Sequence, residues 1–167
     1  MRLIETRWST AADAASLAEL HRAAWRNAYA GIIPGLTLER MIARRGADWW
    51  RGMHGAGGRA LVVEFDETVA GYATLGRGRS RDRGHRCGEI YELYVRPEYQ
   101  GCGLGRSLFR DARARLRRRG LDGLLVWALA ENEVACRFYL AMAGTECARG
   151  QDRFCGKPLE KVGFAWS

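Results

Sequence analysis

The most informative segment of this chain is Tyr91–Ser107, which reads YELYVRPEYQGCGLGRS. Its first residues predict a strand, three glycines follow in close succession, and a helical pattern begins directly afterwards. Glycines let the main chain turn tightly and direct several N–H groups the same way, and a helix start adds unpaired N–H groups and a positive dipole end. The segment therefore predicts a binding site for a phosphate or pyrophosphate group.

The spacing of the glycines narrows the choice of ligand. The run Gly101–Gly105 lacks the Lys-Ser/Thr ending of a P-loop, and its glycines stand too close together for the dinucleotide fingerprint G-x-G-x-x-G. The pattern that remains is Gln100-x-x-Gly103-x-Gly105 directly after an apolar strand. This pattern resembles the coenzyme A pyrophosphate loop of the GNAT superfamily of N-acetyltransferases.

Two neighbouring patterns extend the resemblance. Leu93–Pro97 (LYVRP) resembles the family's central strand and its exit, and Asn132–Tyr139 (NEVACRFY) resembles the family's second signature, in the same order along the chain. The family usually ends that second signature with Gly and an aromatic residue, whereas Thr145 follows the glycine here. The resemblance covers Glu89 to about Gly144 and the rest of the chain in outline.

The resemblance implies an α+β fold: a mixed, mostly antiparallel central sheet of about six or seven strands, with helices on both faces. It implies an enzyme that moves an acetyl group from acetyl-coenzyme A to a primary amine of a small molecule or a peptide or protein, by direct attack in a ternary complex and without a metal. It also suggests a homodimer. The implied cofactor-binding residues lie on the strand, on the glycine loop and in the second signature: Leu93, Tyr94, Val95, Gln100, Gly101, Cys102, Gly103, Leu104, Gly105, Arg106, Ser107 and Asn132.

Acetyl transfer to an amine needs a group that helps remove a proton from the alkylammonium ion, whose reference pKa is near ~10.4. Glu92, on the strand that leads into the glycine loop, is the best-placed carboxylate, with Tyr94 on its face and Leu93 on the opposite one. The alternative interpretation is a salt-bridged residue near an arginine. Glu89 and Glu131 are weaker candidates, because each is expected at a strand end where solvent is available.

Tyr139 is the candidate acid that protonates the departing thiolate. By position alone this residue is a core aromatic, and the resemblance favours the catalytic interpretation because the family's Phe-Tyr pair places the hydroxyl near the sulfur. Asn132 has two interpretations as well: a residue that reaches the cofactor, or the N-cap of the helix that follows it. The amide N–H of Tyr94 or Val95 is a candidate to polarise the acetyl carbonyl.

Composition limits the class of protein. The chain has 167 residues, of which 47% are hydrophobic, so we expect a single domain over residues 1–167. No apolar run is long enough for a membrane span, and the first residues contain no signal-peptide core, so we expect a cytoplasmic protein. The five cysteines include no C-x-x-C pair, which argues against a disulfide framework and a zinc site.

The net charge of +8 suits an anionic ligand or a polyanionic partner. Basic residues concentrate in Arg77–Arg86 and on the outer face of the helix after the glycine loop. Nucleic acid is therefore a conceivable but not favoured partner. Three alternatives stay open: an acetyltransferase acting on an RNA-borne amine, a coenzyme A-binding sensor without turnover, and a nucleic-acid-binding module.

The acceptor amine itself is not identified by the sequence. In the family, acceptor specificity comes largely from the first two helices and from loops near the final strands. Here those regions include the basic loop Arg77–Arg86 and four aromatic side chains that either line a pocket or pack between helices: Trp25, Tyr29, Trp49 and Trp50.

Periodicity and turn signals predict the remaining elements. The expected helices are 11–29, 36–44, one starting near 104 and ending before Gly120, and 133–142. The expected strands are 2–8, 60–65, 69–75, 89–95, 124–129, 146–154 and 159–165. Trp49 and Trp50 are ambiguous between helix and loop, and 124–129 is expected to lie beside 91–95 as a central strand.

Overall fold

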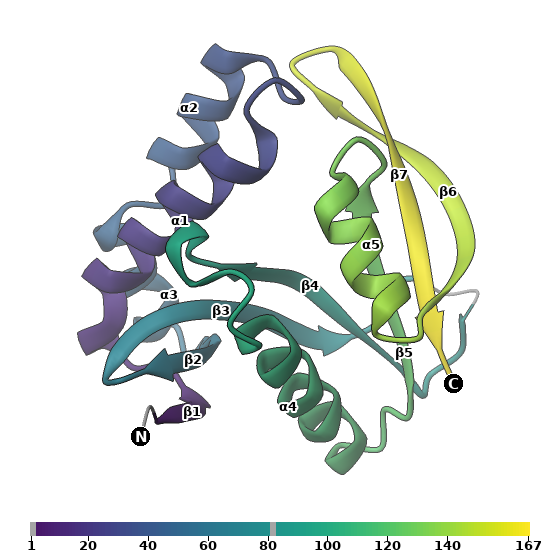
Figure 1. Cartoon of the computed structure of the whole chain (residues 1–167), viewed down its shortest axis with the longest axis horizontal. Coiled ribbons are helices and arrows are strands. Elements are labelled where there is room, and N and C mark those ends of the chain that lie inside the picture. The colour runs from purple at the N-terminus through teal and green to yellow at the C-terminus, as the bar shows by residue number, and fades with distance from the viewer. Residues whose placement is uncertain (1–2, 81–82) are drawn as a thin grey trace.

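The computed structural model describes residues 3–80 and 83–167. Within these residues seven strands form one sheet, in the order β1-β2-β3-β4-β5-β7-β6 (Figure 1). The strands are β1 (Ile4–Trp8), β2 (Leu61–Phe65), β3 (Thr68–Arg77), β4 (Cys87–Val95), β5 (Gly123–Leu129), β6 (Thr145–Phe154) and β7 (Lys157–Trp166). Only β4 and β5 are parallel among the described pairs.

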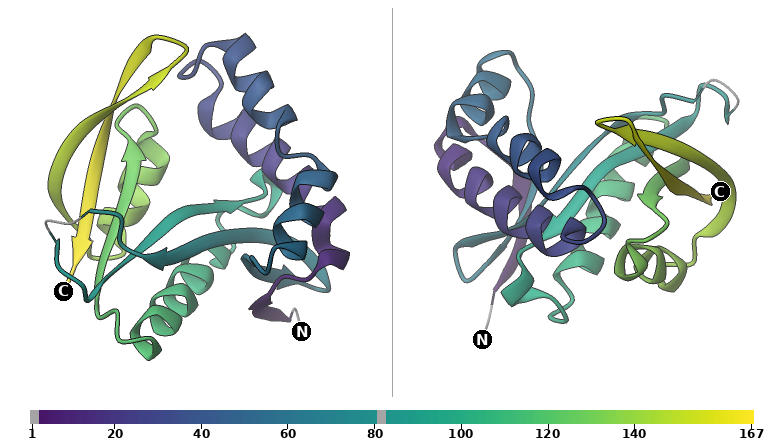
Figure 2. Two further views of the ribbon diagram at one scale, coloured as in Figure 1. Left: turned by 180° about the vertical axis from the view of Figure 1, so that it is seen from behind. Right: turned by 90° about the horizontal axis from the view of Figure 1, so that it is seen from above.

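Helices cover both faces of this sheet (Figure 2). They are α1 (Ala14–Tyr29), α2 (Gly35–Ala43), α3 (Ala47–Gly55), α4 (Leu104–Arg118) and α5 (Glu133–Ala141). Helices α4 and α5 pack on one face, and α1 to α3 lie on the other (Figure 1). The predicted fold class, a mixed and mostly antiparallel sheet with helices on both faces, is confirmed.

The predicted elements agree with the structure within a few residues. The first helix begins with a single 3₁₀ turn, and the ambiguous pair Trp49 and Trp50 lies inside α3. The strand expected over residues 2–8 starts at Ile4, and Arg2 lies outside the described residues. In the basic stretch Arg77–Arg86, residues 81 and 82 also lie outside them.

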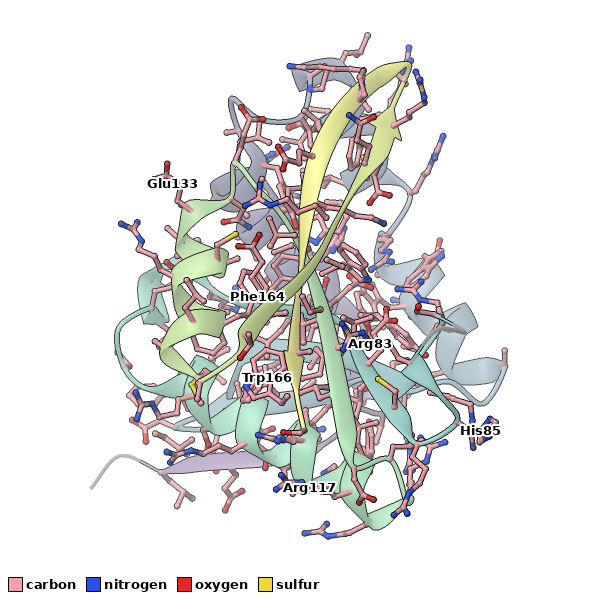
Figure 3. The ribbon with its side chains drawn as sticks, turned by 90° about the vertical axis from the view of Figure 1, so that its right-hand side faces the viewer. Arg83, His85, Arg117, Glu133, Phe164 and Trp166 are labelled. Atoms are coloured by element: carbon pink, nitrogen blue, oxygen red, sulfur yellow. The ribbon has the colours of Figure 1, made fainter. Side chains whose placement is uncertain are left out.

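Helix α4 shows the predicted separation of apolar and basic faces. Its buried side chains are Leu104, Leu108, Phe109, Ala112 and Leu116. Arg115, which the sequence places toward the apolar side, hydrogen-bonds Asp111 and stacks over the Trp8 ring. Arg119 follows the last helical residue and is exposed. Arg117 points outward at the end of the helix (Figure 3).

Strand β4 places its alternate side chains on opposite faces of the sheet, as predicted. Leu93 and Val95 pack against the core beneath α4, whereas Tyr94 packs with the cluster formed by α1 and α3. A β-bulge interrupts the pairing with β3, because Thr74 faces Glu92 while the next residue of β3 faces Ile90. Bulges re-aim side chains near functional sites, and this one lies directly before Glu92.

The expectation for Glu89 was wrong. We expected this residue at a solvent-accessible strand end, but β4 begins two residues earlier and Glu89 is 2% exposed. Its carboxylate accepts hydrogen bonds from the guanidinium and the backbone N–H of Arg79. A buried carboxylate needs such a partner, and the arginine that supplies it lies beyond the end of β3.

The parallel pairing between β4 and β5 is short. It joins Cys87–Ile90 to Gly123–Val126 and ends there, although both strands continue. Strand β5 remains paired to β7 up to Leu129, while β4 remains paired to β3 up to Val95. The sequence correctly predicted the two strands as neighbours, but residues 91–95 have no pairing with β5.

Helix α2 contacts strands β5 and β7 beyond the end of the parallel pairing between β4 and β5. Leu38 and Ile42 of α2 pack with Leu129 of β5 and Leu159 of β7 in one buried apolar cluster. The helical layer thus reaches the β6–β7 hairpin at the top of Figure 1. Among residues 3–80 and 83–167, no helix combines the length and hydropathy needed to cross a membrane.

The interior between α1 and the sheet contains one fully buried histidine. His21 packs against Trp25 and Trp50, and its Nδ1 lies 3.0 Å from the Tyr72 hydroxyl. Burial, reinforced by the charge of Arg45, lowers the pKa of His21 to about 3. The imidazole is therefore neutral in the folded protein throughout the physiological pH range.

This burial predicts a pH dependence of stability. An unfolded histidine binds a proton below about pH 6.5, whereas folded His21 does so only near pH 3, so the unfolded state binds more protons in between. The free energy of unfolding should fall as the pH drops through this window, by about 1.4 kcal/mol per pH unit from this group. Urea unfolding between pH 4.5 and 7 measures the slope. His21→Gln should flatten it and the exposed-site control His85→Gln should not; equal slopes in wild type and His21→Gln would contradict the assignment.

Candidate functional site

A cleft of about 610 Å³ occupies the space where β4 and β5 diverge. Its walls come from the end of α1, the second half of β4, the glycine loop, the end of β5 and helix α5. Most of the predicted site residues line it: Glu92, Leu93, Tyr94, Val95, Gln100, Gly101, Gly103, Gly105, Arg106, Asn132 and Tyr139.

Three predicted residues do not line this cleft. Cys102 is exposed on the loop, and Leu104 is buried in the core beneath α4. Ser107 lies in a separate, shallower depression on the outer side of α4, beside Arg110. Their side chains point away from the cleft walls, so any contact of Cys102 and Leu104 with a bound ligand falls to their backbone atoms.

The glycine loop has the conformation that its sequence predicts. Gly101 and Gly103 adopt φ values of 81° and 80°, in the left-handed region that side chains disfavour. Helix α4 begins at the next residue, and its first intrahelical bond runs from Ser107 N–H to the Gly103 carbonyl. The N–H groups before Ser107 therefore lack helical acceptors and, with the dipole, favour an anion at this end of the cleft.

The divergence of β5 also leaves backbone groups of β4 without a strand partner. On the other side of β4, Arg96 N–H donates to the carbonyl of Ala70 next to β3. In an antiparallel ladder every second residue directs its backbone groups to the same neighbour, so those of Tyr94 and Glu92 also face β3. Leu93 and Val95 fall between those positions, so their N–H and C=O groups face the cleft. Of the two predicted amide donors, Val95 thus points toward the cleft and Tyr94 toward β3.

Glu92 lies at the centre of a polar cluster that joins α1, the α2–α3 connection and the sheet. Arg45 Nη1 donates to both carboxylate oxygens, at 2.9 and 2.6 Å. The Tyr72 hydroxyl donates at 3.0 Å and the Thr74 hydroxyl at 3.3 Å. Since Tyr72 donates its proton to Glu92, its oxygen accepts from His21 Nδ1. The structure therefore contains the arginine partner that one of the two interpretations of Glu92 requires.

Tyr139 lies on α5, packed against Phe109, Phe164 and Trp166. Figure 3 labels the last two on β7, the strand beside β5. Burial, and then the neighbouring Tyr29, raise the pKa of Tyr139 above its ordinary value of 10. The side chain lines the cleft, and within the described residues its hydroxyl forms no hydrogen bond. Because this hydroxyl is protonated and forms no hydrogen bond with the described residues, it can donate one to a ligand atom.

The wall opposite α5 contains a pair of tyrosines. The Tyr29 and Tyr94 hydroxyls lie 2.6 Å apart, which ties the end of α1 to β4 beside the cleft. Asn132 acts as the N-cap of α5, since its side chain accepts from Ala135 N–H. It also lines the cleft, so its two predicted interpretations are compatible with each other.

The aromatic residues named as acceptor candidates divide into two groups. Trp50 is fully buried and belongs to the core, whereas Trp49 is 41% exposed. The Arg45 guanidinium lies 4.6 Å from the ring centre of Trp49 and 5.9 Å from that of Trp25. Helix packing thus explains Trp50, and the others surround the cluster that contains Glu92.

The sequence model of the Acetyltransferase (GNAT) family matches residues 15–144, which include the cleft walls described above. The chain belongs to this family. The resemblance inferred from the glycine loop and the second signature is confirmed.

Individual GNAT relatives match different shares of the chain. The uncharacterized N-acetyltransferase YuaI of Bacillus subtilis is 29% identical over 98% of this chain and 93% of its own length. L-amino acid N-acyltransferase MnaT of Escherichia coli is 36% identical over 61% of this chain and 56% of its own. The mycothiol acetyltransferase of Nocardiopsis dassonvillei is 34% identical over 62% of this chain, which corresponds to only 31% of that enzyme.

Solved GNAT structures share the fold. The PaiA N-acetyltransferase of Thermoplasma acidophilum in complex with coenzyme A has a TM-score of 0.74 at 21% identity, covering 95% of this chain and 98% of that one. YncA of Salmonella typhimurium, solved with acetyl-CoA, has a TM-score of 0.67 at 24% identity, with 98% and 92% coverage.

Sequence reasoning missed Arg45, Tyr72, Thr74 and His21. Each is far from Glu92 along the chain and none belongs to a recognisable motif. The apolar periodicity of α1 indicates that position 21 faces the core, but it does not reveal the polar partner there. Only the folded structure brings these side chains together around Glu92.

The glycine loop generates a prediction about stability. Gly103→Ala should lower the free energy of unfolding by about 1 kcal/mol, because a residue with a Cβ disfavours the φ value of 80° at this position. The added Cβ would meet no atom within 4 Å, so a steric clash does not contribute to the loss. Gly105→Ala is the matched control. Gly105 is helical, and its Cβ would lie 3.4 Å from the Phe138 ring, so this variant should be neutral or slightly more stable. Urea titration compares them, and an unchanged midpoint for Gly103→Ala would contradict the prediction.

Proposed function

We propose that this protein transfers the acetyl group of acetyl-coenzyme A to the primary amine of a small molecule, a peptide or a protein, by direct attack within a ternary complex. The observation that carries the proposal is the cleft between β4 and β5, with the glycine loop at one end and Glu92 and Tyr139 on its walls. The whole chain, residues 1–167, is proposed to act as one catalytic domain.

The residues present fit coenzyme A chemistry. The free N–H groups at the start of α4 and the side chain of Arg106 suit a pyrophosphate. The backbone groups of Leu93 and Val95 suit the amides of the pantetheine arm, which can pair with them as an added strand would. Acetyl-coenzyme A supplies the thioester acyl group, and the protein supplies orientation and proton transfer. Val95 N–H is the proposed donor to the acetyl carbonyl oxygen.

Glu92 is the proposed proton acceptor for the attacking amine, directly or through water. Glu92 already accepts four hydrogen bonds, two from Arg45 and one each from Tyr72 and Thr74, which match the roughly four acceptor positions of a carboxylate. Glu92 also lines the cleft, so the amine or its bridging water is proposed to replace the longest of these contacts, the 3.3 Å bond from Thr74. The Arg45 charge disfavours a protonated amine beside it, which helps to present a neutral nucleophile.

Tyr139 is the proposed proton donor to the departing thiolate. Its raised pKa keeps the phenol protonated at neutral pH, so the hydroxyl is available as a donor. A hydrogen bond to the sulfur as negative charge develops stabilises the leaving group even where the proton is transferred late.

The names of two relatives suggest which amines to test first as acceptors. Besides MnaT, the L-methionine sulfoximine/L-methionine sulfone acetyltransferase of Salmonella typhimurium is 32% identical over 60% of this chain and 58% of its own length. Both names describe acylation of amino acids or their analogues. Free amino acids therefore come first in the panel of candidate amines, followed by peptides.

Removal of the Tyr139 hydroxyl tests the acid. Tyr139→Phe should lower kcat by about 100-fold while acetyl-coenzyme A still binds, since general acid catalysis typically contributes at least that factor. Release of free thiol from acetyl-coenzyme A is the assay. Tyr91 also lines the cleft, but its hydroxyl already donates to the Arg77 carbonyl, so Tyr91→Phe controls for loss of a tyrosine hydroxyl that is not free to act as an acid. Unchanged turnover in Tyr139→Phe would reject this role, and cofactor binding without turnover of any amine would favour a sensor.

Neutralising Glu92 tests the base. Glu92→Gln should lower kcat/KM about 100-fold at pH 7, and the deficit should shrink as the pH rises toward the pKa of the amine, because the free amine then exists without help. A pH–rate profile of both proteins measures this. A deficit that stays constant with pH would assign Glu92 a positioning role only.

A further inference from the structure

Arg45 uses only part of its guanidinium to hold Glu92. Both contacts to the carboxylate come from one nitrogen, Nη1. Within the described residues, Nε and Nη2 form no hydrogen bond, and the side chain is 26% exposed. Arg45 does not itself line the cleft, but it contacts the cleft wall through Glu92, which does. Arginine and a carboxylate normally bind through two parallel N–H groups. The remaining edge of this guanidinium is therefore free to bind a second anion.

The orientation of Arg45 is fixed by aromatic side chains. Its guanidinium lies over the Trp49 ring and near Trp25, and Trp49 packs edge-on against the buried Trp50. Stacking restricts the plane of the guanidinium, so little rotational freedom is lost when a ligand binds its free edge. A guanidinium held by the core in this way is pre-organised for recognition.

The charges around the proposed reaction centre indicate what that second anion is. Glu92 would face the reacting amine, but Arg45 already neutralises its charge, so the pair attracts a simple cation only weakly. A ligand that carries an ammonium and a carboxylate close together complements both members of the pair. Its ammonium faces Glu92 while its carboxylate binds Nε and Nη2 of Arg45.

We propose that Arg45 is the acceptor-specificity residue and that the acceptor carries a carboxylate next to the reacting amine, as α-amino acids do. The inference rests on the proposed acetyl transfer and narrows its substrate class. Arg45 binds the ground state and the transition state alike, so its contribution is to affinity for the acceptor and not to the chemical step.

The first test uses the wild-type protein and matched acceptors. For each of several side chains, thiol release is compared for the L-amino acid, its α-amide and the decarboxylated amine. The free acid should have a kcat/KM at least 10-fold above the other two, through a lower KM. Equal values across the three forms would overturn the inference while leaving acetyl transfer intact. Absence of turnover with every amine would instead reject the proposed function.

The second test changes the guanidinium. Arg45→Lys keeps the positive charge beside Glu92 but loses the planar fork, and it should raise KM for the free acid about 10-fold with little change for the amide. The double variant Arg45→Gln/Glu92→Gln removes the pair without leaving a lone buried charge, and it should abolish the preference for the acid in whatever turnover remains. Arg44→Gln, one residue earlier and exposed, is the control.

The decisive readout is the ratio of acid to amide activity. A purely structural role for Arg45 predicts equal losses for both acceptors in Arg45→Lys. A selective loss for the acid, absent in Arg44→Gln, supports direct binding of the carboxylate. Circular dichroism and urea unfolding confirm that each variant is folded before the ratio is compared.

Discussion

The candidate site exists because β4 stops pairing with β5 partway along both strands. Four residues of each strand form the parallel ladder, and beyond Ile90 and Val126 the strands separate while each keeps its other neighbour. The separation leaves polar backbone of β4 facing open space in the middle of a sheet, which a protein tolerates only where water or a ligand pairs with it. Every part of the candidate site lies around that gap.

Glu92 connects this backbone feature to the helical layer. The β-bulge before it directs its side chain toward Arg45, Tyr72 and Thr74, so that the α2–α3 connection and the sheet meet at a single carboxylate. Helix α1 joins this cluster indirectly, because His21 hydrogen-bonds Tyr72. Four hydrogen bonds from three donor groups satisfy this largely buried carboxylate. Burial next to this cluster, and then the charge of Arg45, keep His21 neutral, so the cluster also affects how stability depends on pH.

The parts of the fold and of the site that arise from interactions between residues close together in the sequence could be predicted. Gly101 and Gly103 need positive φ values, Asn132 caps the helix that it precedes, and the apolar period of 104–116 defines the buried face of α4. These features depend on residues a few positions apart. The contact of Arg45 with Glu92 and the burial of Glu89 under Arg79 depend on how separate elements are oriented, which no short-range pattern encodes. The sequence therefore predicted the conformation of the glycine loop and of the helix starts better than the polar cluster around Glu92.

The contact of α2 with β5 and β7 has a consequence for stability. Leu38 and Ile42 come from the first third of the chain and Leu159 from its last residues, yet together they brace the strand that forms one cleft wall. The walls themselves come from α1, from residues 91–106 and from residues 127–142. The lining residues thus span most of the chain, and β5, which forms one wall, is paired along its length to β7 of the last hairpin. A ligand that binds these walls is therefore expected to stabilise the whole chain and not one segment.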